Sequence, residues 1–208
     1  MGSAAQSSTM AMAVRETAAN HGDLVAVRTA DDSTSLTWAQ LLDEVDLLAG
    51  GLRQLGVERG STVALMMGNR PEFHVSDLAV VTAGGAPFSI YQTYTAEQAA
   101  YVIEDAGAEI AIVSSEFLEV VQEASKLVPT LSTIITVDGE AGEGLTPWSA
   151  VRGANPDFDA AAAAASVEEE DLLTLIYTSG TTGPPKGVEL TNSNLVPVVR
   201  AVADLVHL

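Results

Sequence analysis

Apolar residues recur with helical spacing between residues 37 and 55 of this chain. They mark one face of a helix at Trp38, Leu41, Leu42, Val45, Leu48, Ala49, Leu52 and Leu55. Thr37 and Gln40 have the spacing of a capping box at the start of this face, and Gly56 follows its end. The pattern predicts an amphipathic helix that buries its apolar face.

Short apolar runs and helical patterns then alternate along the middle of the chain. The predicted strands are 61–67, 88–90, 109–113 and 132–137, and the predicted helices are 71–83, 95–106 and 115–128. Pro71 suits a first helical turn, Thr95 and Gln98 repeat the capping-box spacing, and Ser115 is expected to cap its helix. This alternation predicts an α/β fold, a doubly wound, mostly parallel sheet flanked by helices.

The last third of the chain begins with a polar stretch and ends in an apolar helix. Residues 155–170 contain six consecutive alanines and the start of an acidic run, which predict a solvated linker or a frayed helix. The acidic run 168–171 is interpreted as a solvated face and not a metal site, because adjacent carboxylates cannot all converge. Residues 172–177 form an apolar run typical of a buried strand, and a helix is predicted from Thr191 to Leu208.

Residues 177–187 read YTSGTTGPPKG, the pattern in this chain that says most about chemistry. Glycines let backbone N–H groups converge on an anion, hydroxyls add donors or metal ligands, and a lysine adds a mobile positive charge. The chain has only two lysines, Lys126 and Lys186, and one of them closes this segment. A buried strand before it and a helix after it would be the setting of a phosphate-binding loop.

Two other interpretations of this segment are weaker. A plain surface turn does not require so many hydroxyls, a closing lysine and a preceding strand. The P-loop of nucleoside triphosphatases requires G-x-x-x-x-G-K-[ST], whereas here Pro185 precedes Lys186 and Gly187 follows it.

Composition narrows the class of protein further. The 208 residues are 47% hydrophobic, which predicts a packed globular domain, and the absence of cysteine excludes disulfides and thiolate metal sites. A formal net charge of −19 opposes binding to nucleic acid. No apolar run is long enough for a transmembrane helix, and the first 18 residues read as a frayed start and not a signal peptide. The predicted location is cytoplasmic.

The segment YTSGTTGPPKGV resembles the phosphate-binding signature of adenylate-forming enzymes, which include acyl-CoA synthetases, luciferases and peptide-synthetase adenylation domains. Upstream segments are similar to the same family and occur in its order: LTWAQL at 36–41, VALMMGNRPEF at 63–73, DLAVVTAGGAP at 77–87 and YQTYTAEQAAYVIED at 91–105. The Gly-Thr-Thr-Gly form of the loop and the segment at 91–105 lean toward long-chain fatty acid–CoA ligases.

The resemblance implies the chemistry of an acid–thiol ligase. A fatty carboxylate attacks the α-phosphate of ATP to give acyl-adenylate and pyrophosphate, and CoA then displaces AMP, with Mg²⁺ accompanying the phosphates. The resemblance makes Thr178 a ligand of Mg²⁺. It assigns phosphate contacts to Thr178, Ser179, Gly180, Thr181, Thr182, Gly183 and Lys186. Because fatty acids partition into membranes, we also expect the protein to contact a membrane surface peripherally.

The resemblance also implies that much of the chemistry lies elsewhere. The Y-G-x-T-E and T-G-D segments of the family do not occur in the 208 residues, so no catalytic residue is assigned here. We expect residues 1–35 to be a partly flexible N-terminal segment and 36–208 an incomplete AMP-binding domain without the C-terminal domain, inactive alone. Its partner would be the missing C-terminal portion, or a second copy through exposed apolar surface. The alternatives are a non-catalytic nucleotide-binding fragment complemented by a separate chain, and an adenylation domain for another acid.

Overall fold

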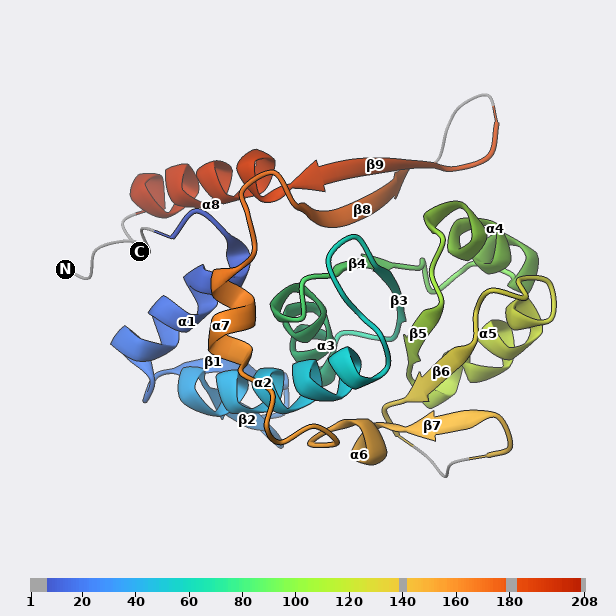
Figure 1. Cartoon of the computed structure of the whole chain (residues 1–208), viewed down its shortest axis with the longest axis horizontal. Coiled ribbons are helices and arrows are strands. Elements are labelled where there is room, and N and C mark those ends of the chain that lie inside the picture. The colour runs from blue at the N-terminus through green and yellow to red at the C-terminus, as the bar shows by residue number, and fades with distance from the viewer. Residues whose placement is uncertain (1–6, 139–141, 179–182, 207–208) are drawn as a thin grey trace.

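The computed structural model describes residues 7–138, 142–178 and 183–206, and it contains a seven-stranded sheet. The strand order is β7-β6-β5-β3-β4-β8-β9, parallel from β7 to β8 and antiparallel between β8 and β9 (Figure 1). The strands are β3 (Thr62–Met66), β4 (Ala86–Ser89), β5 (Ile110–Val113), β6 (Thr133–Thr136), β7 (Leu145–Pro147), β8 (Leu172–Thr178) and β9 (Lys186–Thr191). A separate antiparallel pair is formed by β1 (Val25–Arg28) and β2 (Ser35–Thr37).

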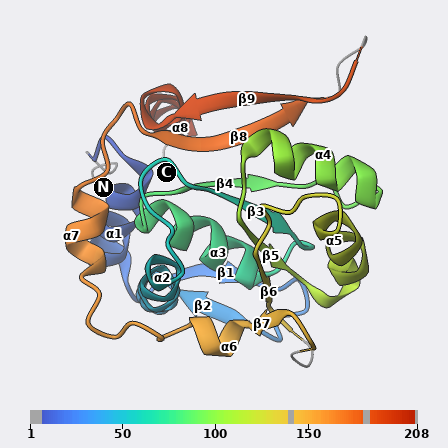
Figure 2. The same cartoon turned by 45° about the vertical axis from the view of Figure 1, so that its right-hand side comes forward.

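Helices cover both faces of this sheet (Figure 2). They are α1 (Met10–His21), α2 (Trp38–Gln54), α3 (Pro71–Thr82), α4 (Ala96–Ala106), η1 (Ser115–Phe117, a 3₁₀ turn), α5 (Leu118–Ser125), α6 (Trp148–Val151), α7 (Ala160–Ala165) and α8 (Asn192–Val206). The predicted α/β class, a doubly wound and mostly parallel sheet flanked by helices, is therefore confirmed. No helix in the described part of the chain is long and apolar enough to cross a membrane.

Alternation along the central strands explains how one sheet supports two cores. In β3, Val63 and Leu65 belong to the cluster that contains α2 and α3 residues, while Ala64 and Met66 belong to the cluster that contains α4 and α5 residues. Because successive side chains of a strand point to opposite faces, each central strand contributes to both cores. Such strands are nearly continuous apolar runs, which is why the sequence pattern located them.

Both predicted capping boxes are present. The Gln40 amide donates to Thr37 Oγ1 at 3.3 Å, and the Thr37 amide donates to Gln40 Oε1 at 2.9 Å. Thr95 and Gln98 make the same reciprocal pair at the start of α4. The prediction that Ser115 caps its helix is wrong, because the segment begins with η1 and Ser114 precedes it without a side-chain capping bond.

The expectation of a frayed start is wrong for residues 10–18, because α1 begins at Met10. Ala11, Val14 and Ala18 are buried at helical spacing, and α1 packs against α2, α3 and α7. Because two of these three buried residues are alanines, the apolar face of α1 is only weakly visible in the sequence pattern. Residues 155–170 include α7, whose first turn is capped by the Asp159 carboxylate, so this stretch is partly helical.

Candidate phosphate-binding site

The phosphate-binding signature connects the two strands of a hairpin. Thr178 pairs with Lys186 across β8 and β9, so these two residues stand at the mouth of the connection. The helix predicted from Thr191 is confirmed, because α8 begins at Asn192, but the strand β9 between the loop and this helix was not predicted. The six-residue stretch KGVELT pairs with β8 as an edge strand, and a run this short gives a weak periodic signal.

The hairpin has an inner and an outer face. On the inner face of β8, Leu173, Leu175 and Tyr177 are buried, whereas Ile176 and Thr178 are exposed on the outer face. The prediction of a fully buried strand is therefore wrong for one side of β8. Because directly opposed residues share a face, Thr178 and Lys186 lie on the same outer side as the Ile176–Val188 pair.

The structure describes three of the assigned site residues. Thr178, Gly183 and Lys186 are exposed to solvent. The remaining assigned residues lie outside the described residues, and they are Ser179, Gly180, Thr181 and Thr182. The hairpin register thus brings the predicted metal-ligating hydroxyl and the predicted phosphate-binding ammonium opposite each other.

At the loop end, the hairpin is tied to α4. Tyr177, only 3% exposed, donates from its hydroxyl to Asp105 Oδ2 at 2.8 Å. Burial and then this bond to a carboxylate raise the pKa of Tyr177 above its ordinary value, so the phenol stays a donor. The Phe88 ring lies 5.7 Å from the Tyr177 ring, between centroids.

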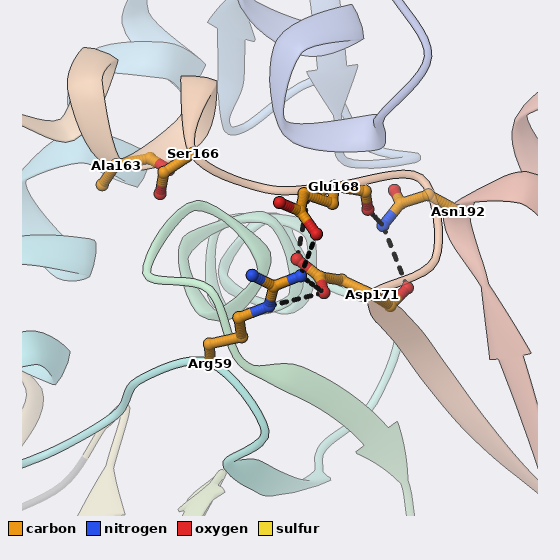
Figure 3. A network of polar contacts seen from close by, with 6 residues as sticks. All are labelled: Arg59, Ala163, Ser166, Glu168, Asp171 and Asn192. Atoms are coloured by element: carbon orange, nitrogen blue, oxygen red, sulfur yellow. Dashed lines mark hydrogen bonds and ion pairs between the residues drawn. The ribbon is translucent and has the colours of Figure 1, made fainter.

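At the opposite end, the hairpin is held by a denser polar network (Figure 3). Arg59 donates from Nε to Asp171 Oδ1 at 2.7 Å and pairs with Glu168. Asn192 is 1% exposed, its Nδ2 donates to the Asp171 carbonyl at 3.2 Å, and its Oδ1 accepts from the Met10 amide at 2.9 Å. This network joins the starts of α1, β8 and α8. Glu168 to Glu170 are exposed, which confirms the solvated face, while Asp171 has a structural role.

A second cluster of charges lies where β3 and β6 end. Arg70 pairs with Glu72 at 2.8 Å and with Asp138 at 2.5 Å. Arg70 lowers the pKa of Glu72 against the opposing effect of burial. Burial also disfavours ionised Asp138, but Arg70 and the Ser115 amide outweigh it and lower the pKa of Asp138. Both carboxylates are thus already paired with Arg70, which leaves them poor candidates for binding Mg²⁺.

Two pockets open beside the end of β4 and share Ser89, Ile90 and Tyr91 in their walls. The larger, about 390 Å³, also reaches β3 and the start of α3, and the smaller, about 290 Å³, is walled by β8 from Thr174 to Tyr177. In open α/β sheets, ligands bind beyond the carboxyl ends of the strands. The smaller pocket lies beside β8, the strand that leads into the phosphate-binding signature, and so agrees with this rule.

Sequence reasoning missed Asp105 and Asn192. Each makes a hydrogen bond to a residue far away in the sequence. The separation is 72 residues between Asp105 and Tyr177 and 182 residues between Asn192 and Met10. Asp105 carried no local signal, because it reads as one more acidic residue at the end of a helix. Among the described residues, no group of three or more His, Asp or Glu side chains is arranged to hold a metal ion.

The described residues form a doubly wound α/β sheet with an outlying hairpin, whose two strands flank the glycine- and hydroxyl-rich segment with its closing lysine. The sequence profile of the family described as AMP-binding enzyme matches residues 14–207, and the chain belongs to this family. The family assignment confirms the resemblance seen in the loop and in the upstream segments.

Relatives and solved structures agree with this assignment. The chain is 33% identical over 168 residues to the long-chain-fatty-acid–CoA ligase FadD15 of Mycobacterium bovis, covering 80% of this chain and 28% of that protein. It is 39% identical over 131 residues to the uncharacterized protein Rv1549 of Mycobacterium tuberculosis, covering 63% and 73%. The anthranilate CoA ligase AuaEII, solved with anthranoyl-AMP, superposes with a TM-score of 0.79 at 26% identity, covering 86% of this chain and 34% of that one.

The coverage differs between these relatives. The chain spans about 28% of the length of FadD15, but its aligned part makes up 73% of Rv1549. The aligned region is therefore a minor part of one relative and most of the other.

Proposed function

We propose that this chain is the phosphate-binding part of an AMP-forming long-chain fatty acid–CoA ligase. The observation that carries the proposal is the register of the β8–β9 hairpin, which sets Thr178 opposite Lys186 at the mouth of the signature loop. The similarity to FadD15 supports a fatty acid as the substrate. In this function, the loop grips the β- and γ-phosphates of ATP, while the fatty carboxylate attacks the α-phosphate.

The chain's own residues supply positioning and electrostatic stabilisation. Lys186 neutralises charge on the phosphates, and it carries no ion pair to a carboxylate in the described structure. Thr178 offers a hydroxyl oxygen of the kind that Mg²⁺ accepts as a ligand. When bound together with the phosphates, Mg²⁺ would supply positive charge that screens their negative charge.

The remainder of the site has to cover the outer face of the hairpin. Ile176 and Val188 are 46% and 43% exposed beside Thr178 and Lys186. On α8, the apolar residues Val198, Val199, Val202 and Leu205 are each more than half exposed. We propose that the part of an acyl-CoA ligase that this chain does not span packs here. The chain alone would then bind nucleotide without forming acyl-CoA.

Nucleotide binding tests the site directly. The affinity of the purified chain for Mg²⁺–ATP would be measured by calorimetry for wild type, Lys186→Ala and Lys126→Ala. Lys126 is the matched control, because it is the chain's other lysine and pairs with Glu123 at 2.5 Å on α5. We expect Lys186→Ala to raise the Kd about tenfold or more and Lys126→Ala to leave it unchanged. Equal affinities for all three would contradict the phosphate-binding role.

Reconstitution tests the reaction. The chain would be mixed with the portion of FadD15 beyond its aligned segment, and acyl-CoA formation from palmitate, ATP and CoA would be assayed. We expect acyl-CoA formation in the mixture and in neither part alone. Rapid acyl-CoA formation by the chain alone would contradict the proposal that it needs the remaining portion of a ligase. ATP–pyrophosphate exchange driven by amino acids and not by fatty acids would favour the alternative, an adenylation domain for another acid.

A further inference from the structure

The hairpin that carries the loop is attached to the central sheet over a short length. Among the described residues, its ladder with β4 is the single pair Phe88 and Leu175, beside which Thr174 Oγ1 donates to the Pro87 carbonyl at 2.8 Å, whereas β3 pairs with β4 through four residues. Beyond that pair, the ends of β8 and β9 that flank the loop lie beside α4 in both views (Figures 1 and 2). Some contact other than the strand ladder therefore has to fix where the mouth of the loop lies.

Tyr177 provides such a contact, and it is the residue immediately before Thr178. Its ring packs in the core cluster shared by β4, α4 and β8, and its hydroxyl reaches Asp105 Oδ2 at 2.8 Å near the end of α4. Asp105 is itself exposed to solvent. A carboxylate that could be hydrated instead accepts from a buried phenol, which ties an exposed helix end to the hairpin.

Gly187 makes room for this arrangement. It is the residue opposite Tyr177 in the ladder and the neighbour of Lys186. A Cβ at this glycine would lie 3.1–3.3 Å from the outer atoms of the Tyr177 ring, including the hydroxyl oxygen at 3.2 Å. Any larger residue would therefore press on the ring that reaches Asp105, so the glycine has a packing role beyond the backbone of the loop.

We propose that Tyr177, Gly187 and Asp105 are positioning residues that hold the mouth of the phosphate-binding loop, Thr178 and Lys186, beside α4. The proposal rests on the proposed function, since the mouth matters only if the loop grips phosphate. Tyr177 acts through its neighbour Thr178, and Gly187 acts through its neighbour Lys186. This positioning role requires no contact between the phosphates and Tyr177 or Asp105.

The test separates the hydrogen bond from general packing. Tyr177→Phe removes the hydroxyl but keeps the ring, Asp105→Ala removes the acceptor, and Asp105→Asn keeps an acceptor oxygen. Tyr101→Phe on α4 is the control, because its ring packs against the same core cluster. Each variant would be measured for Mg²⁺–ATP affinity, for thermal midpoint, and for hydrogen exchange in peptides covering 172–178 and 183–191.

We expect Tyr177→Phe and Asp105→Ala each to accelerate exchange in these peptides and to raise the Kd for Mg²⁺–ATP about three- to tenfold. The double variant should be no worse than either single variant, because both remove one interaction. Asp105→Asn should remain near wild type and Tyr101→Phe should change neither measurement.

Two outcomes would overturn the proposal. One is that Tyr177→Phe and Asp105→Ala behave like Tyr101→Phe, and the other is that exchange accelerates while the affinity of an ATP-binding chain stays the same. If the wild-type chain binds no ATP, the proposed function fails for the isolated chain. In that case the exchange measurements still decide whether the Tyr177–Asp105 bond fixes the hairpin.

Discussion

The parallel strands β3 to β6 and the β8–β9 hairpin belong to one sheet, but their side chains are buried differently. All four residues of β5 are buried, as are four of the five residues of β3. In β8, burial alternates along the strand, and no residue of β9 is buried. The parallel half is a core covered by helices on both faces, whereas the hairpin is an edge with one side open.

Because of this difference, the parallel half contributes most of the packed core, and the hairpin carries the residues predicted to bind phosphate. The parallel half has apolar contacts on both faces and needs few polar contacts to hold its position. The hairpin carries the assigned phosphate-binding residues, and its place depends on Tyr177 and Asp105 at one end and on Asn192 and Arg59 at the other. Substitutions in the two regions should therefore destabilise the protein in different ways.

The largest effect is expected from a cavity in the parallel half. Ile112 in β5 is fully buried, whereas Ile176 in β8 is 46% exposed. Ile112→Ala should lower the free energy of unfolding by about 2–5 kcal/mol, because it leaves a cavity in a packed core. Ile176→Ala should cost less than about 1 kcal/mol, the scale of one cross-strand contact. Urea unfolding measures both, and equal losses would contradict the contrast between the two regions.

The next effect is expected where the hairpin meets α1. Asn192→Ala should lower the free energy of unfolding by about 1–3 kcal/mol, because the partly buried Met10 amide loses its acceptor. The matched control is Asn194→Ala, which removes an exposed side chain whose Oδ1 accepts from the Thr191 amide at 3.0 Å. The control should cost less than Asn192→Ala, because water can replace its bond. Urea unfolding of both variants gives the two losses. If Asn194→Ala is as unstable as Asn192→Ala, the buried hydrogen bonds of Asn192 do not have the role described here.

The sequence located the parallel half more completely than the hairpin, for physical reasons. The capping pairs at Thr37 and Thr95 are local, and strands buried on both faces are continuous apolar runs, so both can be recognised within a few residues. The strand order and the edge strand β9 depend on contacts between distant segments. For the site, the loop signature identified the residues, but the tie from Tyr177 to Asp105 joins residues that no local pattern connects.

The third prediction concerns pH and the helix α3, which packs on the parallel half. Burial raises the pKa of Asp77 from 3.8 to about 6. The folded state therefore holds this proton at pH values where the unfolded chain has released it. The contribution of Asp77 to the free energy of unfolding is therefore highest below about pH 4. It falls as the pH rises from 4 to 6 and is constant above that range.

Asp77→Asn should remove this loss. We expect the variant to be more stable than wild type by about 1–2 kcal/mol near pH 7, a value reduced from the full shift because the side chain is only partly buried, and to match it near pH 4. Unfolding curves at both pH values give the difference. The same gain at both pH values would show that Asp77 does not titrate as described.

The smallest effect is expected from the ion pairs of Arg59, at the end of the hairpin far from the loop. The Arg59 side chain is 56% exposed, and its partners Asp171 and Glu168 are 13% and 67% exposed. Exposed ion pairs are weakened by solvent and salt, so Arg59→Ala should lower the thermal midpoint less than Asn192→Ala, and the difference should shrink in about 0.5 M NaCl. Arg28→Ala is the control, because Arg28 pairs with Asp32 at 3.3 Å between two exposed side chains. A large loss for Arg59→Ala that salt does not reduce would mean that the mostly buried Asp171 carboxylate needs this cation, and that the hairpin depends on charge as well as on Asn192.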